Sequence, residues 1–360
     1  MNFFEDSCQI DDKTLTLQVG KLAKASEVSV LGRIGDTCVL VTVNTAKTSE
    51  DLDYLPLHVE YVEKLYAGGK IKGSRWVKRE GKPTDEAVLN ARLIDRGIRP
   101  FFPKNYNKSI QIIITLLSID GVNSPEILAA VTTSAALHIS SIPWNGPLGT
   151  IRIGCIKANE DDSFIVNPDV NELAISYLDM IVTSTKEKVV MLEAQAEILS
   201  EKTILNGIEL AKKENEKIID FINKFQKKVG LPKEKINEEI YNQKIVSILK
   251  KDFSKEIDEL IKHKAEKEFD DETVKKTLLE KINEKYKDEF ENKEILRAMD
   301  YIVSQTVRDK ILKTKKRLDN RKEDEIRDLF VELSILQNSR FSNFSKRGHP
   351  SVIDCYFRIT

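Results

Sequence analysis

The stretch SPEILAAVTTSAALHIS, residues 124–140, predicts a buried helix that packs on a sheet. Ser124 and Pro125 form a start signal, because a hydroxyl residue caps the first turn and proline fits the first helical position. The alanine-rich body that follows suits close packing of the helix against a flat surface. We therefore expect neighbouring segments of the chain to supply a β-sheet on which this helix lies.

Strand-like segments occur on both sides of this helix in the sequence. Apolar and β-branched runs, separated by Gly, Pro, Asn and Asp, are LTLQVGKLA (15–23), CVLVTVNT (38–45) and IQIIITLLSID (110–120). The segment LDMIVTSTKEKVVMLEAQA (178–196) predicts a hairpin of two core strands. Helical patterns occupy residues 84–99 and 200–228, the latter long and amphipathic. This mixture of strands and helices predicts an α+β fold.

The composition changes near residue 230, where Gly230 and Pro232 interrupt the helical pattern. We expect a first α+β core over residues 1–230. An all-helical domain follows over residues 233–315, since apolar residues there recur at helical spacing among Lys, Glu and Asp. Turn residues and strand-like runs return over residues 316–348, which predicts the start of a second α+β core. Residues 349–360 form an anomalous tail, whose β-prone run has no partner strand.

Charge and composition narrow the class of protein. The chain has 360 residues and a formal net charge of −1, so any nucleic-acid site needs locally concentrated basic residues. No run of about 18 apolar residues suits a membrane span, and the first residues lack the order of a signal peptide, so we expect a cytoplasmic protein. The four cysteines lie far apart, which indicates neither a zinc site nor a disulfide framework.

The densest functional pattern lies in residues 61–103. Three glycines within residues 68–73 predict a flexible loop. The loop carries cationic and aromatic side chains: Arg75, Trp76, Lys78 and Arg79. Because cations bind phosphates and an indole ring stacks on a base, this loop predicts a grip for single-stranded nucleic acid.

Three arginines belong to the predicted helix that follows this loop. Arg92 and Arg96 are four residues apart and share one helix face, while Arg99 follows just beyond the helix end. Three guanidinium groups at this spacing suit convergence on a phosphate. The alternative is that they form structural ion pairs with acidic neighbours such as Asp95 or Glu80.

These motifs together resemble the N-terminal part of bacterial polynucleotide phosphorylases. The resemblance is carried, in family order, by EKLYAGGKIKG (63–73), KREGKP (78–83), ARLIDRGIRPFFP (91–103), SPEILAAVTTSAALHISSIPWNGPLGTIRIG (124–154) and residues 178–196. Trp76 stands where the family usually has Phe, and Gly97 where Pro is common. The resemblance implies an RNase PH-like core of mixed and antiparallel sheets with packed helices, then an all-helical domain and a partial second RNase PH-like core.

The resemblance also implies an activity and partners. Family members form ring-shaped homotrimers that take single-stranded RNA into a central channel. They degrade mRNA in the 3′-to-5′ direction, using inorganic phosphate to release nucleoside diphosphates with the help of Mg²⁺. By motif match, Lys78 and Arg79 are the loop contacts to RNA. Arg92, Arg96 and Arg99 are phosphate or structural arginines of the first core.

The family's phosphate-binding serines, metal-binding aspartates and neighbouring lysine belong to the second core. We therefore expect neither catalytic residues nor metal ligands in this chain, and very low activity from it alone. Asp36, Asp120 and Asp179 are expected to be turn-forming or capping carboxylates. Two alternatives stay open: a non-catalytic RNA-binding or ring-forming subunit, and an inactive product of a frameshifted gene.

The end of the chain departs from the family pattern. In RLDNRKEDEIR (317–327), Asn320 replaces the usual Gly, and we expect the turn to survive because both residues tolerate the left-handed conformation. The match is lost after Gly348. Codons for residues 349–358 also encode, one base out of register, a strand like Thr37–Val43, so we hypothesise a frameshift near codon 349. Resequencing tests this, and an uninterrupted original frame through Thr360 would refute it.

Overall fold

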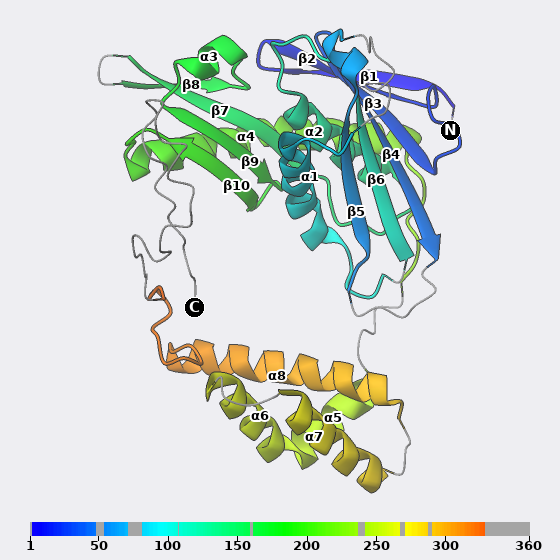
Figure 1. Cartoon of the computed structure of the whole chain (residues 1–360), viewed down its shortest axis with the longest axis vertical. Coiled ribbons are helices and arrows are strands. Elements are labelled where there is room, and N and C mark those ends of the chain that lie inside the picture. Colours follow the sequence, from blue (N-terminus) through cyan, green and yellow to red (C-terminus); the bar gives the residue numbers. More distant parts are fainter. Residues whose placement is uncertain are drawn as a thin grey trace, which may run out of the picture. The chain divides into compact units, whose positions relative to one another are not determined.

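The computed structural model describes residues 2–47, 54–70, 81–106, 108–158, 161–236, 242–266, 271–286 and 290–327. The chain divides into two compact units, Met1–Glu238 and Glu239–Thr360. The first unit contains two β-sheets with helices packed on them, and the second is built from helices (Figure 1). The predicted α+β core followed by an all-helical region is therefore confirmed. The finer division of the sequence into domains stays a prediction.

The first sheet has the strand order β1-β2-β3-β4-β6-β5. Its strands are β1 (Phe4–Ile10), β2 (Lys13–Val19), β3 (Val28–Ile34), β4 (Thr37–Lys47), β5 (Leu57–Glu63) and β6 (Lys108–Ser118). All neighbours are antiparallel except β5 and β6, which run parallel. Strands β4 and β6 confirm two of the predicted runs. The run at residues 15–23 is a strand only as far as Val19, because Gly20 takes a φ of 76° and turns the chain.

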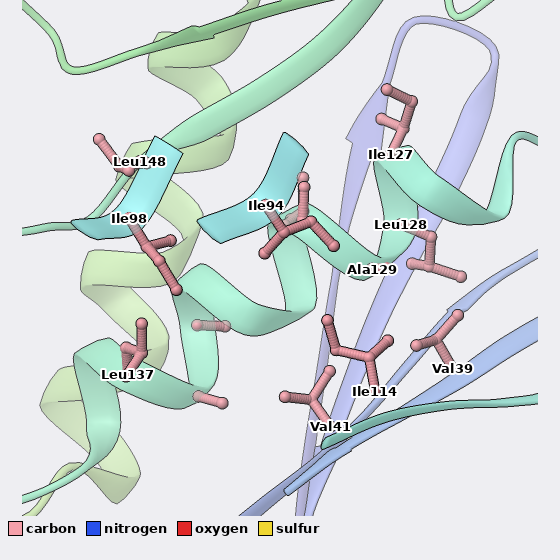
Figure 2. Close-up of a cluster of buried hydrophobic side chains, with 14 of the residues drawn as sticks. Val39, Val41, Ile94, Ile98, Ile114, Ile127, Leu128, Ala129, Leu137 and Leu148 are labelled. Atoms are coloured by element: carbon pink, nitrogen blue, oxygen red, sulfur yellow. The ribbon is translucent and has the colours of Figure 1, made fainter. Parts of the chain in front are cut away.

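Helix α2 (Pro125–Ile139) is the predicted buried helix, and almost all of its side chains are buried. It packs on β3, β4 and β6 of the first sheet. Figure 2 shows Ile127, Leu128 and Leu137 of this helix with Val39 and Val41 of β4. The helix also contacts α1, α4 and strand β7 of the second sheet. It is therefore the element against which both sheets of the first unit pack.

The second sheet is antiparallel and has the order β10-β9-β7-β8. Its strands are β7 (Gly149–Ala158), β8 (Asp161–Val166), β9 (Leu178–Ser184) and β10 (Val189–Ala196). The predicted hairpin over residues 178–196 is confirmed, and β9 is a core strand. The prediction of a second core strand is wrong, since β10 is mostly exposed and buries only Met191. The cause is its position at the edge of the sheet.

Helix α4 (Glu201–Val229) confirms the long amphipathic helix and ends where Gly230 was expected to break the pattern. It covers the second sheet and also reaches β1. Lys228 lies 2.8 Å from the Asp6 carboxylate, and the rings of Phe4 and Phe225 have centroids 5.7 Å apart. The first and last elements of the unit are thus in contact. The remaining elements are η1 (Leu65–Gly68), α1 (Asp85–Ile98), η2 (Arg99–Phe101) and α3 (Val170–Ala174).

The second unit contains α5 (Gln243–Asp252), α6 (Ser254–Glu266), α7 (Asp271–Tyr286) and α8 (Asn292–Thr314). Their apolar faces meet in one core, to which Leu249, Leu260, Ile282 and Ala298 contribute fully buried side chains. Lys, Glu and Asp occupy the outer faces, as expected for solvated helices. Across all the described helices of the chain, none combines the length and apolar character that a membrane span requires.

The turn after α8 has the backbone conformation expected from its sequence. Asn320 takes a φ of 65°, the left-handed region, and its N–H donates to the Arg317 carbonyl at 3.0 Å. The Arg317 N–H in turn donates to the Arg321 carbonyl at 2.8 Å. The expectation that Asn replaces Gly without loss of this turn is confirmed. The strand-like runs after residue 327 and the tail at 349–360 lie outside the described residues.

The contact between β3 and α2 leads to a prediction about Gly32. A Cβ atom at this position would lie 2.0 Å from the Thr132 hydroxyl on the buried helix, so a side chain forces the two elements apart. We expect Gly32→Ala to lower the free energy of unfolding of the first unit by about 1–3 kcal/mol, measured by urea denaturation. The matched control is Gly97→Ala in α1, where the new Cβ meets Thr183 at an ordinary 3.6 Å. Equal stability of both variants would contradict this account.

Candidate functional site

Helix α1 lies against the edge strand β5 and carries the three arginines that the sequence singles out. Its start is fixed by Thr84, whose hydroxyl accepts a backbone N–H of the first turn at 3.0 Å and donates to the Glu63 carboxylate at 2.8 Å. Ile94 and Ile98 are buried and fix the rotation of the helix. Helix and strand are thereby joined at the point where β5 ends.

Arg99 is held by several protein acceptors. Two of its nitrogens donate to the Asp95 carboxylate at 2.9 and 2.7 Å, as a bidentate pair. The guanidinium also donates to the carbonyl oxygens of Leu55 and Leu57, at 3.3 and 3.1 Å. Arg99 therefore ties α1 to the beginning of β5 and covers backbone acceptors at the sheet edge.

Arg96 and Arg92 differ in their surroundings, although they share one helix face. Arg96 forms an ion pair with Glu193 on β10, so it links α1 to the second sheet. Arg92 is exposed and has no hydrogen bond or ion pair with any residue that the structure describes. The structure thus brings Arg92 and Arg99 to one cavity and turns Arg96 toward another strand.

The cavity beside Arg92 lies between α1 and β5 and has a volume of about 420 Å³. Its walls are apolar at Val59, Ala87 and Ala91, and polar at Arg92 and His58. A guanidinium without a protein partner, next to an apolar wall, is able to bind an anion that has a flat apolar part. The four loop residues predicted to bind nucleic acid, Arg75, Trp76, Lys78 and Arg79, lie outside the described residues, as does Glu80.

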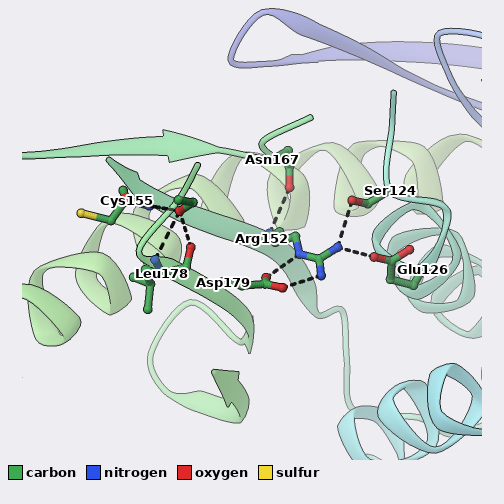
Figure 3. A network of polar contacts seen from close by, with 8 residues as sticks. Ser124, Glu126, Arg152, Cys155, Asn167, Leu178 and Asp179 are labelled. Carbon is green, nitrogen blue, oxygen red and sulfur yellow. Dashed lines mark hydrogen bonds and ion pairs between the residues drawn. The ribbon is translucent and has the colours of Figure 1, made fainter. Parts of the chain in front are cut away.

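A cluster around Arg152 is the most extensive polar network of the unit, and sequence reasoning missed it (Figure 3). Arg152 on β7 donates to Asp179 on β9 at 2.6 and 2.8 Å and forms an ion pair with Glu126 of α2. It also donates to the Ser124 hydroxyl at 3.2 Å. Ser124 therefore occupies the N-cap position of α2 without capping it through its side chain. No local pattern marks this cluster, because its members come from three separate elements.

Asp120 stabilises the turn between β6 and α2. Its carboxylate accepts the backbone N–H groups of Val122 and Asn123 at 2.9 and 2.8 Å, the Asn123 side-chain amide at 2.6 Å, and the Asp36 N–H at 3.2 Å. Burial raises the pKa of Asp120, but the hydrogen bonds from Asn123 and Val122 outweigh this and hold the pKa below its usual range. The structure agrees with a turn-forming role for Asp120 and Asp36. Asp179 is different, since it pairs with Arg152 from within a strand.

The residues described do not fit the Mg²⁺ that the resemblance implies. No group of three or more His, Cys, Asp or Glu side chains able to hold a metal ion occurs among them. The carboxylates of Asp120, Asp179 and Glu126 are already occupied by backbone N–H groups or by Arg152. A hard cation needs such oxygens as ligands, so these three do not form its site.

Comparison with known proteins identifies relatives over most of the chain. Two family models match in succession: the 3′ exoribonuclease family, domain 1, at residues 11–143, and domain 2 of the same family at residues 146–214. The polyribonucleotide nucleotidyltransferase of Caldicellulosiruptor bescii is 39% identical over 96% of this chain and 49% of its own length. That of Thermus thermophilus is 35% identical over 95% and 48%. The chain spans about half the length of the curated relatives it matches.

A solved structure is also similar. The crystal structure of rice (Oryza sativa) Rrp46 covers 59% of this chain and 94% of that chain, with a TM-score of 0.45 and 16% identity.

The Asp120 turn predicts a pH-dependent contribution to stability. We expect Asp120→Asn to lower the free energy of unfolding by about 1–3 kcal/mol at pH 7, because an amide replaces a charged acceptor of four hydrogen bonds. Since the folded-state pKa is lowered, this contribution is present above the unfolded value of about 3.9 and is lost as the pH falls through the folded value. Urea denaturation at pH 7 and pH 3 should show the two proteins converging in acid. A constant difference would contradict the assignment.

Proposed function

Because residues 11–214 of this chain belong to the 3′ exoribonuclease family, we propose that the chain is the RNA-binding half of an enzyme that degrades mRNA from its 3′ end. The proposed reaction is phosphorolysis. Inorganic phosphate attacks the terminal phosphodiester, a nucleoside diphosphate leaves, and the RNA is one nucleotide shorter. Relatives named polyribonucleotide nucleotidyltransferase over 96% of the chain support this proposal. A cytoplasmic location, Mg²⁺ dependence and a homotrimeric ring belong to the same proposal.

The observation that best supports RNA binding by this chain is the position of Arg92. It is a guanidinium without a described partner, beside a cavity wide enough for a nucleotide. Arg96 and Arg99 are occupied by Glu193 and Asp95, which favours a structural role for them. We therefore propose Arg92 as the contact to a backbone phosphate. Lys78 and Arg79, with Arg75 and Trp76, are the proposed loop contacts.

A non-catalytic RNA-binding subunit is the second candidate. It is favoured by the occupied state of Asp120, Asp179 and Glu126, which leaves these carboxylates unavailable for a metal. Phosphoryl transfer needs charge stabilisation at the transferring group. In this alternative the chain holds RNA and a separate polypeptide performs the chemistry.

The three arginines give a test that separates binding from structure. Arg92→Met should weaken binding of a single-stranded RNA oligonucleotide, and the slope of log K against log salt should become shallower by about 0.7, as expected for one lost phosphate contact. Its unfolding curve should match that of the parent protein, because no described partner is lost. Arg99→Met should instead lower the free energy of unfolding by about 1 kcal/mol, because Asp95 and two carbonyls lose their donor. The opposite assignment of effects would refute the proposed roles.

The loop gives an independent test of RNA binding. The double variant Lys78→Ala and Arg79→Ala should weaken RNA binding and lower the salt slope by about 1.4, as expected for two contacts to a single strand. The matched control, Lys202→Ala with Lys213→Ala, removes two exposed cations from α4 and should bind as the parent does. Fluorescence anisotropy at three salt concentrations measures both.

The same parent protein also distinguishes the two candidate functions. Incubated with poly(A), phosphate and Mg²⁺, it should release almost no nucleoside diphosphate. Rapid release would show that the chain itself is catalytic and would exclude the non-catalytic subunit. Failure to bind RNA at any salt concentration would refute both candidates.

A further inference from the structure

An exposed aromatic side chain stands at the end of the edge strand β5, outside the cavity described above. Tyr66 in the short helix η1 has 58% of its surface exposed. Two apolar residues nearby are also exposed, Leu65 at 41% and Ile119 at 37%. Ile119 belongs to this surface because its N–H donates to the Ala67 carbonyl at 3.1 Å. Adjacent exposed apolar side chains of this kind mark a surface that binds something.

The backbone that carries Tyr66 is held rigidly. The Ala67 side chain is buried, and its N–H donates to the Lys64 carbonyl at 2.9 Å. The Gly69 N–H donates to the Tyr66 carbonyl, and the Lys70 N–H to the Leu65 carbonyl, both at 3.0 Å. An aromatic ring on such a turn is presented to solvent without a large cost in backbone entropy on binding.

The charges around the ring favour an anionic partner. Lys64 and Lys70 flank η1 in the sequence, and the nearest carboxylate in the sequence, Glu63, accepts a hydrogen bond from Thr84. Gly69 leaves open space beside the ring, since a Cβ there would meet no described atom within 4 Å. A flat aromatic surface with cations on either side suits a base with its phosphate.

Tyr54 provides a comparison within the same strand. It precedes β5, whereas Tyr66 follows it, so the two rings lie at opposite ends of a seven-residue strand. Tyr54 is 64% exposed, similar to Tyr66. However, it follows the acidic sequence Glu50-Asp51-Leu52-Asp53, which repels phosphates. Exposure alone therefore does not distinguish the two tyrosines, but the charge of their neighbours does.

We propose that Tyr66 is a stacking platform for an unpaired base of single-stranded RNA, with Lys70 facing the adjacent phosphate. This inference rests on the proposed RNA-binding function and adds a base contact to its phosphate contacts. Stacking on an aromatic ring tolerates any base, so the platform should hold RNA without selecting its sequence.

The test compares ordinary and abasic oligonucleotides of equal length on the full chain. Tyr66→Leu should weaken binding of single-stranded RNA at least about fivefold, the lower end of the range for one lost stacking contact. Tyr66→Phe keeps the ring and should bind as the parent does. Tyr54→Leu should also bind as the parent does. On the abasic oligonucleotide, the parent and Tyr66→Leu should bind equally, because no base is present to stack.

Each other outcome overturns the inference in a recognisable way. Equal binding of the base-containing RNA by Tyr66→Leu and the parent refutes the platform but leaves the proposed function standing, provided that Arg92→Met still weakens binding. A loss that persists on the abasic oligonucleotide indicates a purely structural role for Tyr66 and also refutes the platform. If the parent binds neither oligonucleotide, the platform and the proposed function both fail.

Discussion

The first unit depends on the burial of a helix that has no polar face. Because α2 is enclosed on nearly all sides, its hydroxyl groups need partners within the protein. Thr132 donates to the Leu128 carbonyl at 2.7 Å within the helix, and Ser134 accepts the Leu148 N–H at 2.8 Å. The second of these bonds joins the helix to the segment that leads into β7. One buried helix thus fixes the positions of both sheets, and Gly32 permits the close approach that this requires.

The same packing decides which cations are available to a ligand. Helix α1 rests on α2 and β5, so its arginines point toward whichever acidic or carbonyl groups the surrounding elements supply. Arg99 meets Asp95 and the strand edge, and Arg96 meets Glu193. Arg152, the most buried of the arginines discussed, is neutralised by two carboxylates, as a charge removed from water requires. Arg92 differs because no described acceptor lies opposite it.

Local patterns in the sequence were sufficient for the elements but not for the site. The capping and composition signals that predict α2 and α4, and the left-handed turn at Asn320, depend on residues close in sequence. The exposure of β10 depends instead on which strand forms the sheet edge. Helical spacing places Arg92 and Arg96 on one face, but Glu193, which pairs with Arg96, lies almost 100 residues further along the chain. Ser124 was expected to cap α2, and a strand residue, Arg152, takes its hydroxyl.

The contact between β1 and α4 has a consequence for how the protein is made. Phe4 leaves the ribosome among the first residues, but its cover, Phe225, is synthesised more than 200 residues later. At about 5–20 residues per second, the first strand waits ten seconds or more for the helix that shields it. During that time its apolar surface is open to chaperones and to other nascent chains. The N-terminal strand is therefore the part of this unit most exposed to misassembly during translation, although it is well packed in the finished fold.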